Sequence, residues 1–303
     1  MSKQGIVVVS DIHAKTEEPY RSAINKFFKW LLESYNIKET AFIFLGDMFD
    51  MSLPHNEVRD EITSYLKKMD AIIITGNHDT SKRNGNSLLS LKHHSNIIVY
   101  EKETEFELCG FHCLALPHQY DMKHYPELTG EYDFVFTHIT PKGCSADFGD
   151  GVELKVKAKY FIHGHIHVSQ KINNHIIPGV PLPTRHGEHL FKPTITIISG
   201  DASLLDVLVP EYFTYETIEY GTMPKTKNNI LNIIKAPSVQ QVYDMYNGYY
   251  IRKEGIELEL IGDNKDQKVS FERGSIIDKF IKYVDEQNVD NVIKNTCLKY
   301  LKV

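Results

Sequence analysis

The chain has 303 residues, a formal net charge of -6, 42% hydrophobic residues and 24% charged residues. This composition is ordinary for a soluble globular protein of one large domain or two smaller ones, and its acidic balance gives no sign of nucleic-acid binding. No apolar run approaches the roughly 20 residues of a membrane helix, and the first residues, MSKQGIVVVSD, lack the apolar region of a signal peptide. We therefore expect a cytoplasmic protein with no membrane partner.

The first hundred residues alternate between short apolar runs and amphipathic stretches. The runs GIVVVSD, TAFIFLGD, DAIIITGNHD and NIIVYE predict buried strands. The stretches EPYRSAINKFFKWLLESYNI and HNEVRDEITSYLKKM predict helices, and NSLLSLKHHS predicts a short one. Strands that alternate with helices predict an α/β sheet covered on its faces.

The next hundred residues read mostly as strands. TEFELCGFHCLALPH predicts a hairpin with Gly110 near its turn, and YDFVFTH, AKYFIHGH and NNHIIPGV follow it. TITIISG, SLLDVLV and FTYETIEYG complete this β-rich stretch. Cys109 and Cys113 lie in the hairpin without a paired CxxC spacing, which predicts reduced packing residues rather than zinc ligands.

A polar segment, GTMPKTKNN at 221–229, separates this part from the rest of the chain and reads as a linker. After it, ILNIIKA predicts a strand, SVQQVYDMY a helix, and YYIRKEG with IELELIG a hairpin. The tail reads as two helices. We therefore divide the chain into a main domain at 1–220, a small α+β domain at 229–265 and C-terminal helices at 274–303.

Polar side chains follow five of the predicted strands. The strand ends are Asp11-Ile12-His13, Gly46-Asp47-Met48-Phe49-Asp50, Gly76-Asn77-His78-Asp79, His138, and Gly164-His165-Ile166-His167. In α/β sheets, ligands bind beyond the carboxyl ends of the strands, so these residues should meet at one edge. The alternative, polar loop ends without a ligand, does not account for five repeats of the same pattern.

Carboxylate, imidazole and amide oxygen together suit manganese, iron or zinc. A carboxylate can bridge two ions about 3.5–4 Å apart, and such ion pairs promote in-line displacement at phosphorus. A histidine beside the pair can protonate the leaving oxygen. Glycines before Asp47, Asn77 and His165 permit tight turns and close approach. The pattern therefore predicts a two-metal site for phosphoester chemistry.

The ordered motifs DIH, GDMFD, GNHD, TH and GHIH resemble the signature of the calcineurin-like metallophosphoesterases, over residues 6 to about 215. The resemblance implies a four-layer α/β/β/α sandwich. It also implies that Asp47 bridges two divalent ions, of which manganese is the expected one. The implied ligands are Asp11, His13, Asp47 and His167 for one ion, and Asp47, Asn77, His138 and His165 for the other. His78 would act on the phosphate or leaving group, and Asp50 would orient His78.

GDMFD followed by a proline, FELCGFHCLALPH, and IIPGVPLP with a later GE resemble the SbcD-type nucleases. This implies a metal-dependent DNA exo- or endonuclease, a small DNA-capping domain, a homodimer, and an SbcC-like coiled-coil ATPase as partner. The chain has no GxxxxGK[ST] sequence, so any use of ATP would come from that partner.

Two further functions stay open. One is a stand-alone metallophosphoesterase acting on a small cyclic nucleotide or a phosphoprotein; the other is a binding protein without turnover, against which the complete ligand set argues. For a DNA substrate, Lys82, Arg83, Arg185 and His186 are candidate contacts, with a solvated loop as the alternative. We expect His163, just before the last motif, to be a strand-end histidine and not a ligand.

Overall fold

The structure is a computed structural model that describes residues 3–81, 83, 85–119, 130–144, 151–185 and 187–258. The chain consists of two compact units, Met1–Glu259 and Leu260–Val303. The predicted C-terminal helices at 274–303, as well as Lys82 and His186, lie outside the described residues. No helix in the described ranges is long and apolar enough to cross a membrane.

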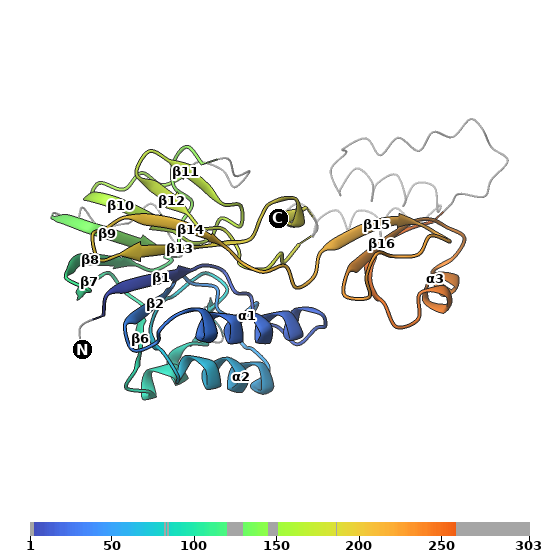
Figure 1. Cartoon of the computed structure of the whole chain (residues 1–303), viewed down its shortest axis with the longest axis horizontal. Helices are drawn as coiled ribbons and strands as arrows, with labels where there is room; N and C mark the ends of the chain where they lie inside the picture. Colours follow the sequence, from blue (N-terminus) through green and yellow to red (C-terminus); the bar gives the residue numbers. More distant parts are fainter. Residues whose placement is uncertain are drawn as a thin grey trace, which may run out of the picture. The chain divides into compact units, whose positions relative to one another are not determined.

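The first sheet has six strands in the order β14-β13-β1-β2-β3-β6. The strands β1 (Gly5–Val9), β2 (Thr40–Phe44), β3 (Asp70–Ile74) and β6 (Ile97–Tyr100) run parallel. The strands β13 (Thr194–Ser199) and β14 (Leu204–Leu208) close one edge in antiparallel pairs. Helices α1 (Tyr20–Ser34) and α2 (Asn56–Leu66) cover one face of this sheet, as Figure 1 shows.

The second sheet also has six strands, in the order β11-β12-β10-β9-β8-β7. Strands β8 (Phe111–Leu116), β9 (Glu131–Thr137), β10 (Lys157–His163) and β12 (His175–Ile177) are parallel. At the two edges, β7 (Thr104–Leu108) pairs antiparallel with β8, and β11 (Gln170–Ile172) pairs antiparallel with β12. The predicted hairpin is β7–β8, and both of its turn residues, Cys109 and Gly110, have positive φ, as a tight type I′ turn requires.

The two sheets stack face to face because successive side chains of a strand point to opposite faces. In β1, Val7 and Val9 pack toward α1 and α2, while Ile6 and Val8 pack toward the second sheet. The same alternation in β2 and β3 fills the space between the sheets, together with aromatic residues such as Phe134 of β9. The predicted α/β sandwich is therefore confirmed. Among the described residues no α-helix covers the outer face of the second sheet, where Leu154 and Val156 pack instead.

The third sheet is small and entirely parallel, in the order β15 (Tyr215–Glu219), β16 (Ile230–Ala236) and β17 (Tyr250–Leu258), with α3 (Val239–Met245) beside it. It begins at Tyr215, inside the range assigned above to the main domain. The predicted hairpin at 249–262 is wrong, because β17 continues without a turn through Gly255 to Leu258. Gly255 marks a close approach rather than a turn, since a Cβ there would lie 2.2 Å from Asn232 Oδ1.

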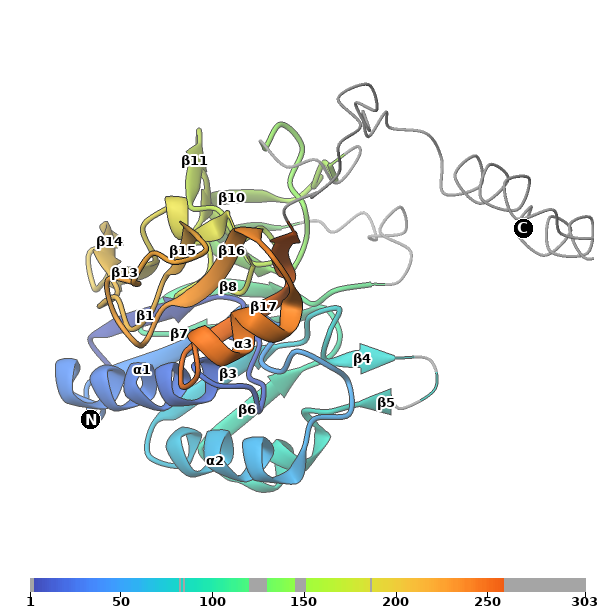
Figure 2. The same cartoon turned by 90° about the vertical axis from the view of Figure 1, so that its right-hand side faces the viewer.

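Two short elements follow β3. A two-stranded ribbon, β4 (Thr80–Ser81) with β5 (Gly85–Asn86), projects from the body in Figure 2. The expected short helix after it is a 3₁₀ helix, η1 (Leu89–His93), and a second one, η3 (Glu188–Leu190), lies in the loop before β13.

Candidate metal centre

The predicted site residues meet at one edge of the sandwich. Asp11 and His13 follow β1, Asp47 follows β2, and Asn77 and His78 follow β3. His138 follows β9, and His165 and His167 follow β10, so the second sheet supplies the other side. Each of these strands is parallel to its neighbour, which places all five carboxyl ends together.

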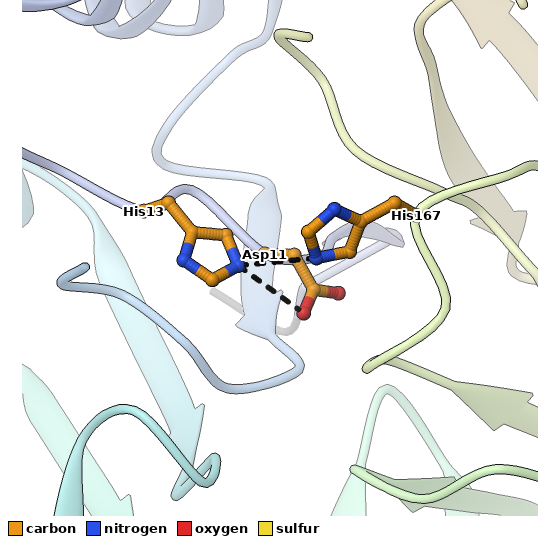
Figure 3. A group of neighbouring side chains, drawn as sticks. All are labelled: Asp11, His13 and His167. Carbon is orange, nitrogen blue, oxygen red and sulfur yellow. Dashed lines mark hydrogen bonds and ion pairs between the residues drawn. The ribbon is translucent and has the colours of Figure 1, made fainter. Parts of the chain in front are cut away.

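The first group is Asp11, His13 and His167, whose ligand atoms all lie within 4.8 Å of one another. Figure 3 shows the two imidazoles turned toward each other above the Asp11 carboxylate. His13 Nε2 is 3.2 Å from His167 Nε2 and 4.0 Å from Asp11 Oδ1. Residues 154 positions apart in the chain thus share one small space.

The second group is Asp47, His138 and His165, with Asn77 between the two rings. Asn77 Oδ1 lies 2.9 Å from His138 Nε2 and 2.9 Å from His165 Nδ1. Asp47 Oδ2 lies 3.4 Å from His138 Nε2 and 3.7 Å from His13 Nε2. The carboxylate of Asp47 therefore stands between the two groups, at the position expected of a bridging ligand.

The donor set fits metal ions. Nitrogen ligands lie about 2.1 Å from such an ion, so two of them at angles of about 90–110° are roughly 3.0–3.4 Å apart. The 3.2 Å between the Nε2 atoms of His13 and His167 falls in this range. Carboxylates, imidazoles and one amide oxygen are the ligand types that bind manganese, iron or zinc.

The outer ring nitrogens support the same conclusion. Metal-binding histidines present one nitrogen to the ion while an oxygen atom holds the other. His138 Nδ1 donates to the Leu45 carbonyl oxygen at 2.6 Å, and His167 Nδ1 lies 2.6 Å from Glu188 Oε1. His13 Nδ1 lies 3.3 Å from Asp50 Oδ1. In all three, Nε2 faces the site and an oxygen atom lies near Nδ1; in His138 and His167 that contact is a hydrogen bond.

Backbone groups fix the two innermost carboxylates. The His165 N–H donates to both Asp11 oxygens at 3.2 and 3.0 Å, and the Ser10 hydroxyl donates to Asp11 as well. The His78 N–H donates to Asp47 Oδ1 at 2.8 Å. Four residues of the site have φ in the left-handed region, where side chains other than glycine are strained: Asp11, His13, Asp47 and His165.

The motif glycines leave room for these side chains. A Cβ on Gly46 would lie 2.4 Å from His138 Nδ1, and one on Gly76 would lie 2.2 Å from Asp47 Oδ1. A Cβ on Gly164 would lie 2.3 Å from the Leu45 carbonyl oxygen and 2.9 Å from His138 Nδ1. Side chains at these three positions would displace the ligands, which explains why a glycine precedes each of three motifs.

The buried charges of the site favour a cation. Burial alone raises the pKa of Asp47, but the charges of His138 and His13 outweigh it and hold that pKa well below its ordinary value. Burial alone lowers the pKa of His138, yet Asp47 and Asp11 raise it to about 10. The raised pKa of His138 shows that the buried carboxylates attract positive charge, whereas the lowered pKa of Asp47 reflects the histidines around it.

His78 lies beside the two groups and forms a third candidate group with His13 and Asp47. Its ring centroid is 4.7 Å from that of His13, in an edge-on arrangement. We expected Asp50 to orient His78, and the contact in the structure is with the Asp50 backbone: His78 Nδ1 donates to that carbonyl oxygen at 2.7 Å. The Asp50 carboxylate instead faces His13. With its proton on Nδ1, neutral His78 leaves Nε2 unprotonated.

Asp79 acts as an internal brace. It is fully buried and accepts hydrogen bonds from the backbone N–H groups of Gly76 at 2.9 Å, Met48 at 3.1 Å and Phe49 at 3.4 Å. Burial, and then the charge of Asp47, raise its pKa to about 7. Asp79 therefore ties the loop after β2 to the loop after β3.

Glu188 is a contributor that we did not predict as a site residue, although it lies in the quoted GE pair. Its Oε2 accepts from the Thr184 N–H at 2.6 Å, the Thr184 hydroxyl at 3.0 Å and the Arg185 N–H at 3.0 Å. The other carboxylate oxygen of Glu188, Oε1, is hydrogen-bonded to His167 Nδ1. The signal for it in the sequence was this GE pair, which follows the proline-rich segment IIPGVPLP.

The remaining candidates lie elsewhere. Arg83 and Arg185 are exposed. His163 is fully buried and is not in any of the three candidate metal-binding groups; its Nδ1 lies 2.7 Å from the Thr137 hydroxyl, and its Nε2 lies 2.8 Å from His175 Nδ1.

Comparison with known protein families shows which family the chain belongs to. Residues 5–169 match the family described as calcineurin-like phosphoesterase. The chain belongs to this family. It is therefore a phosphoric ester hydrolase of a family that uses divalent metals, and the clustered Asp and His residues are its candidate metal site. No curated protein sequence matches it significantly.

Among solved structures, the chain is similar to a protein described as a novel archaeal phosphodiesterase, with 17% identity, a TM-score of 0.39, and coverage of 67% of this chain and 99% of that one. It is also similar to a predicted phosphoesterase from Streptococcus pneumoniae TIGR4, with 13% identity, a TM-score of 0.31, and coverage of 69% and 99%. A third is the protein of unknown function AQ665 from Aquifex aeolicus, with 17% identity, a TM-score of 0.28, and coverage of 50% and 89%. At these TM-scores, nothing about this chain rests on the three likenesses.

Proposed function

We propose that this phosphoesterase is a metal-dependent DNA nuclease similar to the SbcD-type subunits. The observation that carries the metal-dependent part is the orientation of His13, His138 and His167, each with Nε2 toward the site and an oxygen atom near Nδ1. The DNA part is supported by the motif resemblance and by the small sheet at 215–258, which takes the place of a capping domain.

Seven residues would hold the ions, with Asp47 shared: Asp11, His13, Asp47, Asn77, His138, His165 and His167. When bound, two divalent ions supply a nucleophile at neutral pH and offset the charge on the phosphate oxygens; manganese is the proposed ion. Asp11 and Asp47 contribute negative charge that backbone N–H groups hold in place. These contacts keep the ligands in position before substrate arrives, which lowers the cost of reorganisation during the reaction.

His78 is the proposed acid. Its Nδ1 proton is committed to the Asp50 carbonyl oxygen, so a second proton on Nε2 can be passed to the departing sugar oxygen. The backbone N–H of the same residue binds Asp47. The loop therefore sets the acid and the bridging carboxylate at a fixed separation.

The small sheet is joined to the main body through its first strand. Tyr215 and Ile230 belong to the same buried cluster as α1. The Tyr20 hydroxyl at the start of α1 bonds to the Tyr215 hydroxyl and donates to the Thr184 carbonyl oxygen at 3.3 Å. The loop that positions His167 thus touches the residues that anchor the small sheet, which supports its role next to the substrate.

An SbcC-like coiled-coil ATPase, a homodimer and a cytoplasmic location belong to the same proposal. The sequence has no GxxxxGK[ST] motif, so any use of ATP would require a separate subunit. Co-purification with a coiled-coil ATPase, and the mass of the complex in solution, test this part. A chain that copurifies with no ATPase and cleaves DNA alone would restrict the proposal to the nuclease.

The decisive experiment compares wild type, His78→Ala and His93→Ala with Mn²⁺ on labelled linear duplex, labelled single strand and a small phosphodiester. His93 is an exposed histidine on η1 and serves as the matched control. We expect His78→Ala to lower the rate of DNA hydrolysis about 10²- to 10⁴-fold while metal content stays at the wild-type level. Cleavage of the small ester without any cleavage of DNA would overturn the nuclease assignment and leave the metal site intact.

A further inference from the structure

A cavity of about 750 Å³ lies next to the loop that supports His167. Its lining comes from the segment before α1, from Thr184 and Arg185, and from the small sheet with α3. Ligand sites in proteins measure about 300–1,000 Å³, so the cavity is large enough for a nucleotide. None of the metal-site residues lines it.

Tyrosine dominates the wall of this cavity, which contains Tyr20, Tyr215, Tyr243, Tyr249 and Tyr250. The hydroxyls of Tyr20 and Tyr215 are hydrogen-bonded to each other, and the Tyr20 hydroxyl also contacts the Thr184 carbonyl oxygen. Tyr243 of α3 is 37% exposed, and Tyr249 and Tyr250 are half-buried. Partly exposed aromatic rings are the surfaces on which unpaired nucleobases stack.

The charges of the lining suit a neutral ring beside a phosphate. Arg185 and Arg252 are cationic, whereas Glu17 and Glu18 are anionic. The two carboxylates disfavour a run of phosphates inside the cavity but can accept hydrogen bonds from base N–H groups. Arginine planes also stack on bases and pair with phosphate.

The cavity adjoins the residues that support the metal site. Thr184 lines the cavity, and its hydroxyl lies 3.3 Å from His167 Nδ1. On the other side, Lys15 follows His13 by two residues and places its Nζ 3.9 Å from the centre of the Tyr20 ring. A strand with one base in the cavity would pass this ammonium group before it reached the metal ligands.

We propose that this cavity binds an unpaired nucleobase of the DNA substrate and so directs the enzyme to single-stranded ends or flaps. The inference rests on the proposed nuclease function and names its substrate class. A paired base presents no free face to stack, so blunt duplex does not use the cavity.

The test measures affinity of the full-length chain for a fluorescein-labelled dT₂₀ strand and for a labelled blunt duplex, by fluorescence anisotropy with Ca²⁺ replacing Mn²⁺. The variants are Tyr243→Ala, Tyr243→Phe and Arg252→Gln. Arg59→Gln, a substitution on α2 away from the cavity lining, is the matched control for Arg252→Gln. Hydrolysis of a small phosphodiester with Mn²⁺ reports the state of the metal site in each variant.

We expect Tyr243→Ala to weaken binding of dT₂₀ about tenfold, since stacking on one base contributes about 1–3 kcal/mol. Tyr243→Phe keeps the ring and should bind like wild type. Arg252→Gln should also weaken dT₂₀ binding several-fold, whereas Arg59→Gln should not. Duplex affinity and hydrolysis of the small ester should stay unchanged in all four variants.

Unchanged dT₂₀ affinity in both Tyr243→Ala and Arg252→Gln would overturn this inference. Equal losses in Tyr243→Ala and Tyr243→Phe would also overturn it, because the ring itself would not be the contact. Both results leave the nuclease assignment standing if wild type cleaves DNA. If wild type hydrolyses the small ester but neither binds nor cleaves DNA, the proposed function itself fails.

Discussion

Glu188 Oε1 lies 2.6 Å from Nδ1 of His167, on the far side of the ring from the atom that faces the metal site. The hydrogen bond fixes the ring orientation. Burial alone lowers the pKa of His167, but the bond to Glu188 outweighs it and raises that pKa above its ordinary value. The same carboxylate holds Thr184 and Arg185, so it links the metal ligand to the wall of the tyrosine-lined cavity.

Replacing this carboxylate should weaken metal binding without removing a ligand. We expect Glu188→Gln to lower the affinity for Mn²⁺ about 10- to 100-fold, as is typical when the partner of a metal-bound histidine is changed. Titration calorimetry measures the affinity, and activity should return at high Mn²⁺. Equal affinity in wild type and variant would show that Glu188 serves only the loop.

The glycines of the motifs offer a matched test of steric fit. Gly46 and Gly143 both have positive φ, at 95° and 85°, but only Gly46 has neighbours in the place of a Cβ. Gly143→Ala should cost about 1–2 kcal/mol of stability, the penalty for a left-handed alanine. Gly46→Ala has the same backbone strain, and its added Cβ also clashes with His138. It should therefore lower the free energy of unfolding by about 3 kcal/mol or more and release metal.

Urea unfolding with a chelator present measures both variants without the contribution of bound ions, and elemental analysis gives their metal content. Equal losses of stability, with full metal retained in Gly46→Ala, would contradict the proposed contact with His138.

Removal of metal should lower the stability of the wild-type chain. A ligand that binds only the folded state stabilises it by about 2.7 kcal/mol at a concentration 100 times its Kd. We therefore expect Mn²⁺ to raise the melting temperature, a chelator to reverse the rise, and Asp47→Asn to abolish most of it. His93→Ala should respond like wild type. A wild-type melting temperature that Mn²⁺ leaves unchanged would rule out tight binding.

The thiol of Cys113 gives a pH-dependent prediction away from the metal site. Burial, and then the charge of Asp133, raise its pKa to about 12. Because the unfolded value is about 8.5, its contribution to stability is present below that pH and is lost as the pH rises toward 12. At pH 8 the folded chain should therefore leave Cys113 unmodified by iodoacetamide.

Half-buried Cys109 should react faster than Cys113, and both should react fully in guanidinium chloride. Peptide mass mapping gives the labelled positions. A chelator should not change the labelling of Cys113, because its Sγ lies 3.5 Å from the Phe111 carbonyl oxygen in the core. Labelling that a chelator accelerates would revive the zinc-ligand alternative.

Much of the site was predictable because each ligand follows a strand. Apolar runs such as those before Asp11 and Asp47 identify buried strands, and parallel strands bring their carboxyl ends together. The sequence could not show that Asp50 turns its carboxylate to His13 and its carbonyl oxygen to His78, since that choice depends on backbone conformation. Glu188 was equally hidden, because it reaches the site from a loop without a regular pattern.

The small sheet was the least predictable part of the fold. Gly255 looks like a turn residue in sequence, yet in the structure it only makes room for Asn232 on the neighbouring strand. A glycine that makes a turn and a glycine that leaves space for a neighbouring side chain look the same in the sequence. The strand β15 was predicted, but not its place in the small sheet, because its partner β16 lies beyond a polar segment.

The separation of His13 and His167 along the chain bears on how the protein matures. Neither sheet contains a complete set of ligands for one ion, since β1 supplies Asp11 and His13 while the segment after β10 supplies His167. Closing such a long loop is slow compared with forming local structure. A nascent chain therefore has neither of the two four-ligand sets complete until its two sheets have docked, and acquisition of both ions marks the end of folding. Hydrolytic activity then starts only in molecules whose sandwich is finished.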